Sequence, residues 1–190
     1  MKPAPILLLL ALTAACRTAG PTLEPGDGTV FQAVSARFAF REGRERQSGR
    51  VLWRCGGELS KFVFFTPLNQ AGLELAVEGE EAVLANFSSR TYWKGDFSLL
   101  LGRLWGIGLP LAELKALLLE GRVPPRLAEN GIEAWLEGEP GAAPRQVRLR
   151  RGEAELSLRL LKVEARPGRL VRVDYERRYR GADLEEVLGP

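Results

Sequence analysis

The sequence contains no histidine. Without an imidazole the chain lacks the commonest general base, a common metal ligand and the middle member of a Ser-His-Asp triad. The glycine-rich dinucleotide and phosphate-binding motifs and the CxxC motif are missing as well. The carboxylate pairs Glu80-Glu81 and Glu185-Glu186 lie in turn and tail contexts and are interpreted as solvated surface. We therefore predict that the protein is not an enzyme and that it holds no metal ion or cofactor.

A hydrophobic run long enough to cross a bilayer is also lacking, since a spanning helix needs about 20 apolar residues. The apolar run at 6–12 follows Lys2 and leads through small residues into Cys16. A basic start, a short apolar core and a small-residue exit predict a secretory signal peptide at 1–15. The small residues before Cys16 resemble the bacterial lipobox, in which this cysteine is lipidated. The alternative is an ordinary cleaved signal beside a chance cysteine.

Cysteine is scarce, with Cys16 and Cys55 as the two representatives. If Cys16 carries lipid, Cys55 has no intramolecular disulfide partner, and an exported domain must then depend on its core for stability. Within the alternating segment Val51, Trp53, Cys55, the thiol is interpreted as a buried strand residue.

Charge of one sign does not dominate, because the net charge is +3 and the basic and acidic residues are interleaved. No basic run is flanked by aromatic residues on an exposed helix, so we predict no binding of nucleic acid. Arg44, Arg46, Arg50 and the run 145–151 are interpreted as solvated strand faces. Contact between these arginines and anionic headgroups is the alternative.

The chain after the signal divides into a tether and one domain. Residues 16–28 contain Gly-Pro pairs without an apolar period, which predicts an anchor and tether, and residues 29–190 form a single domain. Alternation of apolar and polar residues predicts roughly nine or ten strands joined by short turns, typical of a meandering antiparallel sheet. The expected strands cover residues 30–40, 50–55, 58–66, 73–78, 82–87, 91–93, 132–138, 146–150, 153–163 and 170–179. Residues 182–188 are expected as a short terminal helix or a frayed tail.

Two apolar helices interrupt the strand pattern between 96 and 121. Asp96 is expected to cap the first helix, and Pro110 fits the first turn of the second, which Gly121 ends. Each helix carries an apolar stripe, while Glu113 and its polar neighbours are expected to point outward. Helices this short are unstable alone in water, so each must dock on the sheet. They either cap a filled core or form a lid over a cavity for lipid chains.

The segment LLGRLWGIGLPLAELKALLLEGRVPP, at residues 100–125, resembles the central segment of the LolB family, the outer-membrane receptors for lipoproteins. The strand that runs into Pro67-Leu68 and the spacing from Tyr92 to Asp96 resemble the family too. The resemblance covers about residues 48–125. It implies an α+β fold of the LolA/LolB type, in which a curved antiparallel sheet, an incomplete barrel, is covered by short helices.

The same resemblance implies a function. The protein would accept lipoprotein acyl chains from a soluble periplasmic carrier and insert them into the outer membrane. It would be anchored through Cys16 on the periplasmic face, where Arg17, in place of an acidic residue, favours the outer membrane. Leu68 would be the exposed apolar residue of the membrane-transfer loop, although Asn69 stands where the family usually has glycine.

Aromatic residues and leucines on both strands and helices suggest the lining of a lipid pocket. Chosen by face, the candidates are Trp53, Phe62, Phe64, Leu75, Leu104, Trp105, Leu114 and Leu117. The inward face of residues 62–65 stays open because both alternating sets are apolar. Two other functions stay open: a lipid-anchored structural or interaction lipoprotein without a ligand cavity, and a carrier of other lipids.

Overall fold

A computed structural model describes residues 23–24, 29–66, 68–139 and 141–189. The signal segment 1–15 and the expected lipidation site Cys16 lie outside the described residues. The strands are β1 (Leu23–Glu24), β2 (Val30–Glu42), β3 (Glu45–Gly56), β4 (Leu59–Phe65), β5 (Ala71–Glu78), β6 (Glu81–Asn86), β7 (Thr91–Asp96), β8 (Glu133–Glu137), β9 (Gln146–Arg151), β10 (Ala154–Pro167), β11 (Arg169–Leu170) and β12 (Arg180–Gly181). The helices are α1 (Phe97–Trp105), α2 (Leu111–Leu119), α3 (Arg126–Glu129) and α4 (Leu184–Leu188).

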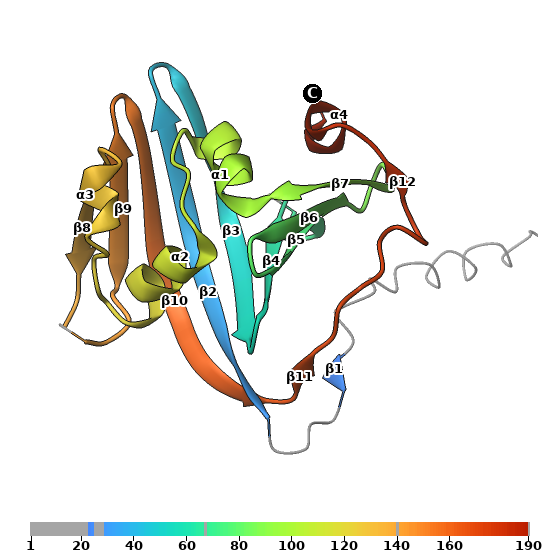
Figure 1. Ribbon diagram of the computed structural model, residues 1–190, viewed down its shortest axis with the longest axis horizontal. Helices are drawn as coiled ribbons and strands as arrows, with labels where there is room; N and C mark the ends of the chain where they lie inside the picture. Colours follow the sequence, from blue (N-terminus) through green and yellow to red (C-terminus); the bar gives the residue numbers. More distant parts are fainter. Residues whose placement is uncertain (1–22, 25–28, 67, 140, 190) are drawn as a thin grey trace, which may run out of the picture.

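Ten of these strands form one curved sheet in the order β12-β7-β6-β5-β4-β3-β2-β10-β9-β8 (Figure 1). Strands β2 to β7 follow one another as an antiparallel meander, and β10 then returns to pair with the free edge of β2. Among the described residues β12 and β8 do not pair with each other, so the sheet is open. The prediction of an incomplete, curved antiparallel barrel covered by short helices is confirmed.

The long pair β2 and β10 forms the spine of the sheet. Their pairing runs from Ala154 opposite Glu42 to Pro167 opposite Val30, with a bulge between Leu160 and Lys162. A bulge bends a strand and increases its local twist, which helps the sheet curve around the helices. Near the far end of this pair, β1 lies beside β11, so the segment expected as a tether contributes two residues to a small second sheet.

The main core lies on the concave face of the sheet, where α1 and α2 are placed (Figure 1). Alternate residues of each strand point inward, as the period-two pattern predicts. Val34 and Ala36 of β2, Leu75 of β5 and Leu84 of β6 are all buried there. The two helices bury their apolar stripes against these side chains, which supplies the docking that short helices require.

The helix boundaries agree with the local signals in the sequence. The Asp96 carboxylate accepts a hydrogen bond from the Leu99 amide at 2.8 Å and caps α1, and Pro110 immediately precedes α2. The expectation for Glu113 was wrong, because this residue of α2 is only 9% exposed. Residues 182–188 do contain a helix, α4, capped by Asp183. No helix among the described residues has the length and apolar character to cross a membrane.

The strand expected at 170–179 was also wrong. Only Arg169–Leu170 is extended and paired, and residues 171–179 form an irregular strap across the outer face of the sheet. Tyr175, a residue of the strap, is buried against Ala76 and Ala85 of the sheet. The alternation of apolar residues therefore reflects burial of one side of the strap and not a strand ladder.

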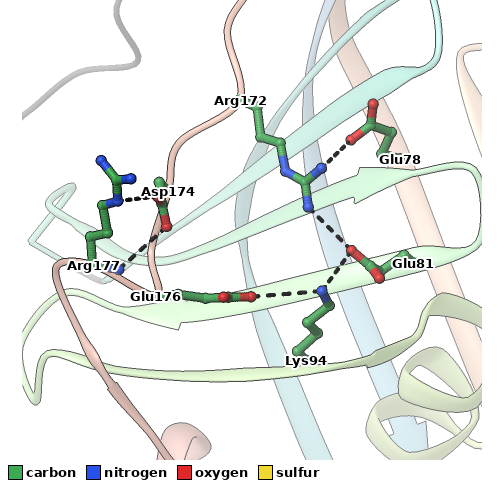
Figure 2. Close-up of polar contacts among 7 residues, drawn as sticks. All are labelled: Glu78, Glu81, Lys94, Arg172, Asp174, Glu176 and Arg177. Atoms are coloured by element: carbon green, nitrogen blue, oxygen red, sulfur yellow. Dashed lines mark hydrogen bonds and ion pairs between the residues drawn. The ribbon is translucent and has the colours of Figure 1, made fainter.

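Ion pairs tie the strap to the sheet (Figure 2). Arg172 contacts Glu78 at 3.0 Å and Glu81 at 3.2 Å, and Lys94 links Glu81 at 3.0 Å with Glu176 at 3.7 Å. Glu78 ends β5, Glu81 begins β6 and Lys94 belongs to β7. The other charged residues belong to the strap. Because exposed ion pairs contribute little singly, the network mainly fixes the position of the strap.

Beneath the strap lies a buried ion pair. Lys61 Nζ is 3.6 Å from Glu74 Oε1, and the two side chains are 1% and 3% exposed. The Tyr175 hydroxyl donates to the same Glu74 oxygen at 2.5 Å. Burial lowers the pKa of Lys61, and the nearby Glu74 carboxylate opposes that shift. Burial and the Glu74 charge raise the pKa of Tyr175 above its ordinary value, so this hydroxyl stays protonated.

Candidate functional site

An entirely apolar pocket lies between the concave face of the sheet and helices α1 and α2. Its volume is about 40 Å³. The lining side chains come from β2, β3, β4, β5, β10, both helices and the turn between them. They are Val34, Ala36, Phe38, Val51, Trp53, Phe62, Phe64, Leu75, Phe97, Leu101, Trp105, Ile107, Leu109, Leu114, Leu118, Leu156 and Leu158. Such a lining offers hydrophobic burial without directional contacts.

The structure brings six of the eight candidate residues into this lining: Trp53, Phe62, Phe64, Leu75, Trp105 and Leu114. It thereby settles the orientation of β4, whose even-numbered Phe62 and Phe64 face the pocket. Leu104 and Leu117 do not line it. Leu104 is half-buried against the core, and Leu117 is fully buried in it.

The helical spacing explains why some pocket residues of α1 and α2 were not predicted and why Leu104 and Leu117 were chosen instead. On α1 the pocket side chains are Phe97, Leu101 and Trp105, and on α2 they are Leu114 and Leu118. Residues four apart lie above one another on a helix face. Leu104 and Leu117 sit one position away from these rows, on the flank of each helix. The i, i+4 series was the signal available in the sequence, but the broad apolar stripes concealed it.

Aromatic rings organise the two ends of the pocket. Deep in the core, the ring of Phe62 stacks between Trp53, at 5.4 Å between centroids, and Phe97, at 6.0 Å. A second group consists of the half-buried residues Phe38, Phe64 and Trp105, whose ring centroids lie 5.9 to 6.2 Å apart. These spacings are typical of favourable aromatic pairs. We call Phe38, Phe64 and Trp105 the mouth aromatics, since they are the more exposed of the two groups.

The connection between the two helices is a tight turn. Gly106 has φ +65°, and its N–H donates to the Gly102 carbonyl at 3.0 Å, which ends α1. A Cβ at Gly108 would lie 2.9 Å from the Ser98 carbonyl oxygen, so only glycine permits this approach of the connection to α1.

Among the described residues, few polar contacts attach α1 and α2 to the rest of the fold. The Glu80 carboxylate accepts from the Leu111 amide at the start of α2, and burial together with the nearby Asp96 raises the pKa of Glu80. Arg103 of α1 reaches Glu185 of α4 at 3.3 Å, where both side chains are exposed. Non-directional apolar contacts therefore provide most of the attachment.

Leu68 lies at the tip of the turn between β4 and β5, and its side chain is 81% exposed. Backbone hydrogen bonds from Thr66 N to Gln70 O and from Asn69 N to Thr66 O, both 2.8 Å, close the turn. Asn69 has φ +60°, a conformation that asparagine tolerates almost as glycine does. Asn69 is therefore compatible with a tight turn in which Leu68 is exposed.

The described residues show no constellation for metal chemistry or an activated thiol. No group of three or more Cys, Asp or Glu side chains in the described ranges is arranged to hold a metal ion. Cys55 is buried, and that burial raises the pKa of its thiol, which opposes formation of a reactive thiolate.

A family model identifies the family of this chain. The family model described as outer membrane lipoprotein LolB matches residues 31–159, from the start of β2 into β10. An outer-membrane lipoprotein LolB from Azoarcus sp. (strain BH72) is 27% identical over 130 residues, which cover 65% of this chain and 65% of that protein. A crystal structure of a LolA superfamily protein from Nitrosomonas europaea is 9% identical, with a TM-score of 0.46 over 80% of this chain and 90% of that one. Because the family model spans most of the chain, the protein belongs to the LolB family.

Proposed function

We propose that this protein is a lipid-anchored outer-membrane lipoprotein that accepts the acyl chains of other lipoproteins from a periplasmic carrier and releases them into the outer membrane. The observation that carries the proposal is the all-apolar pocket closed by two short helices. Membership in the LolB family supports it, as does the name of the Azoarcus relative as an outer-membrane lipoprotein.

Acceptance of an acyl chain requires the helices to move away from the sheet. The pocket volume of about 40 Å³ is far below the volume of about 300 to 1,000 Å³ that is typical of pockets for small molecules. The described conformation is therefore closed. Since α1 and α2 are held mainly by apolar contacts, an entering acyl chain replaces the contacts that the helices give up. No nucleotide is needed, because transfer follows from the difference in hydrophobic burial between carrier and receptor.

Release into the membrane is assigned to the Leu68 turn. A leucine at the tip of a polar turn enters the bilayer interface at little cost to the fold, and burial of its side chain is favourable by about 1.5 to 3 kcal/mol. Cys16 would keep the domain at the membrane surface, with the lipid chains of this anchor buried in the bilayer.

Substitution of Leu68 by glutamate tests the release step. In a chain starting at Arg17, which retains every described strand and helix, we expect L68E to bind a fluorescent lipopeptide within about twofold of the parent. Transfer of the lipopeptide to vesicles should fall by roughly tenfold or more, because the lost burial of about 1.5 to 3 kcal/mol corresponds to that range. Transfer is measured by dequenching of the probe in zwitterionic vesicles.

The matched control is Leu188→Glu, because Leu188 is also an exposed leucine, 36% exposed, and lies on α4. L188E should transfer lipopeptide at the parent rate. Equal losses in both variants, or unchanged transfer in L68E, would contradict the role of the turn.

The small pocket volume favours one further candidate, an anchored interaction lipoprotein with a filled core. This candidate predicts that the protein binds no acyl probe at all. Titration of the chain starting at Arg17 with a fluorescent fatty acyl probe separates the two functions.

A further inference from the structure

The outer face of the sheet has two different halves. The strap of residues 171–179 covers the half formed by β4 to β7. The other half, formed by β3, β2, β10 and β9, carries polar and basic side chains and is open to solvent. Three arginines from different strands lie side by side on this open half.

The strand register fixes the arginine row, which we define as Arg159, Arg37 and Arg50. Arg37 on β2 is directly opposite Arg50 on β3 and directly opposite Arg159 on β10. Residues in such positions have Cβ atoms about 4.5 to 5.5 Å apart, and like charges placed there destabilise a sheet. All three side chains are exposed.

The row has no carboxylate partner among the described residues. Elsewhere on this face two arginines are compensated, since Arg41, four residues further along β2, pairs with Glu155 at 3.0 Å, and Arg150 of β9 pairs with Glu133 at 2.6 Å. What distinguishes the row is that three arginines lie in direct register on adjacent strands. The stability of the fold gives no reason for three like charges in this arrangement without a carboxylate partner, whereas an anionic ligand does.

An aromatic side chain borders the row on one side. On β4, the half-buried Phe65 is opposite Arg50, and Arg50 Nη1 donates to Asn69 Oδ1 at 3.0 Å, next to the exposed Leu68. On the other side, Gln146 of β9 is opposite Arg159. Beyond it, Trp135 of β8 is 48% exposed and lines an open groove of about 420 Å³ whose charged residues are Arg148, Arg150, Glu137 and Glu155. Aromatic rings and basic side chains together are typical of protein surfaces that lie at a membrane interface.

We propose that the arginine row binds the phosphate-bearing headgroups of an anionic lipid surface, so that the outer face of β3, β2 and β10 lies on the membrane when Leu68 enters it. Guanidinium groups suit this ligand because they form paired hydrogen bonds with phosphate oxygens. The bond between Arg50 and Asn69 connects the row directly to the turn that carries Leu68. Headgroup binding would therefore orient the turn toward the bilayer.

The proposal deepens the release step of the proposed function and rests on it for its setting. Its test uses no lipopeptide, so that failure of this proposal can be distinguished from failure of the proposed function. An arginine near an anionic bilayer tightens binding by roughly fivefold, which predicts a loss of about 100-fold when three are removed.

The experiment compares binding of the chain starting at Arg17 to cargo-free vesicles of phosphatidylcholine alone and of phosphatidylcholine with phosphatidylglycerol, measured by sedimentation. We expect the parent to prefer the anionic vesicles and R37Q/R50Q/R159Q to bind them about 100-fold more weakly. The matched control R90Q/R126Q/R178Q removes the same charge from exposed arginines that have no ion pair with a described residue, and it should bind within about threefold of the parent. Raising the salt concentration should remove the preference of the parent for anionic vesicles, since salt screens exposed charges.

Equal losses in the two triple variants would overturn the proposal, because net charge alone would then explain binding. Equal binding of the parent to both kinds of vesicle would overturn it too. A row that serves an acidic protein partner would leave vesicle binding at background, which is a third overturning result. Thermal unfolding of each variant checks that the fold is intact.

Discussion

Replacement of Phe64 by glutamate should weaken binding of an acyl chain by roughly tenfold to 100-fold. Phe64 is a half-buried mouth aromatic. Its ring centroid lies 6.1 Å from that of Phe38 and 6.2 Å from that of Trp105. Burial of a side chain of this size is worth about 1.5 to 3 kcal/mol, and each 1.4 kcal/mol is a factor of ten. A carboxylate at this position would also lose hydration beside an apolar ligand. The measurement is a fluorescence titration of F64E with a fatty acyl probe.

The chain offers a closely matched control in the next residue. Phe65 is also a half-buried phenylalanine of β4, but it points to the outer face beside Arg50. We expect F65E to bind the acyl probe as the parent does and to bind anionic vesicles more weakly, while F64E shows the reverse. Probe binding of F64E at the parent level would contradict the pocket as the acyl site. An equal loss in both variants would indicate a damaged fold instead.

Replacement of Glu74 by glutamine should lower the free energy of unfolding by about 3 to 5 kcal/mol. The substitution removes the counter-charge of Lys61, whose ammonium group is 3.6 Å away and 1% exposed. Breaking a buried ion pair by removing one partner has a cost of this size, because an uncompensated charge stays buried. Since domains are stable by only about 5 to 15 kcal/mol, E74Q should unfold at a clearly lower denaturant concentration.

The control is the double variant K61M/E74Q. Glutamine at 74 retains an oxygen to accept from the Tyr175 hydroxyl, and methionine replaces the charged side chain with an apolar one of similar length. We expect the double variant to recover most of the lost stability, which a double-mutant cycle in urea would measure. A free energy of unfolding for E74Q within about 1 kcal/mol of the parent would show that Lys61 does not carry a buried charge.

The stability of E74Q should also rise with pH. Burial lowers the pKa of Lys61 below its ordinary value of 10.5, and loss of Glu74 removes the charge that opposes this shift. Between the lowered pKa and 10.5 the unfolded chain binds more protons than the folded chain, so the free energy of unfolding increases as pH rises through that window. Unfolding in urea at pH 7 and pH 9 measures the difference, and a flat profile would contradict it.

Several features of this protein followed from local sequence patterns. The cap residue Asp96 and Pro110 placed the starts of the two helices correctly, because a helix end depends on a few adjacent residues. Period-two alternation located most strands for the same reason. It failed at 171–179, where a strap buried on one side has the same alternation as a strand.

The candidate site was predictable only in part. Residues 62–65 are all apolar, so their sequence could not tell which side chains face the pocket. The broad apolar stripes of α1 and α2 gave Leu104 and Leu117 the same weight as Leu101 and Leu118. Docking decided between them, because the orientation of each helix against the sheet is set by packing with distant residues.

The sequence by itself therefore determined an antiparallel sheet and two helices, since alternation, caps and turns act over a few residues. Its resemblance to the LolB family implied the open, curved form of the sheet. The tertiary structure decided the groupings that join distant parts of the chain. Strand register placed Arg37 between Arg159 and Arg50, and the strap buried Lys61 and Glu74 under Tyr175. The physical reason is that a strand pattern specifies which side chains share a face but not which strand becomes its neighbour or in what register.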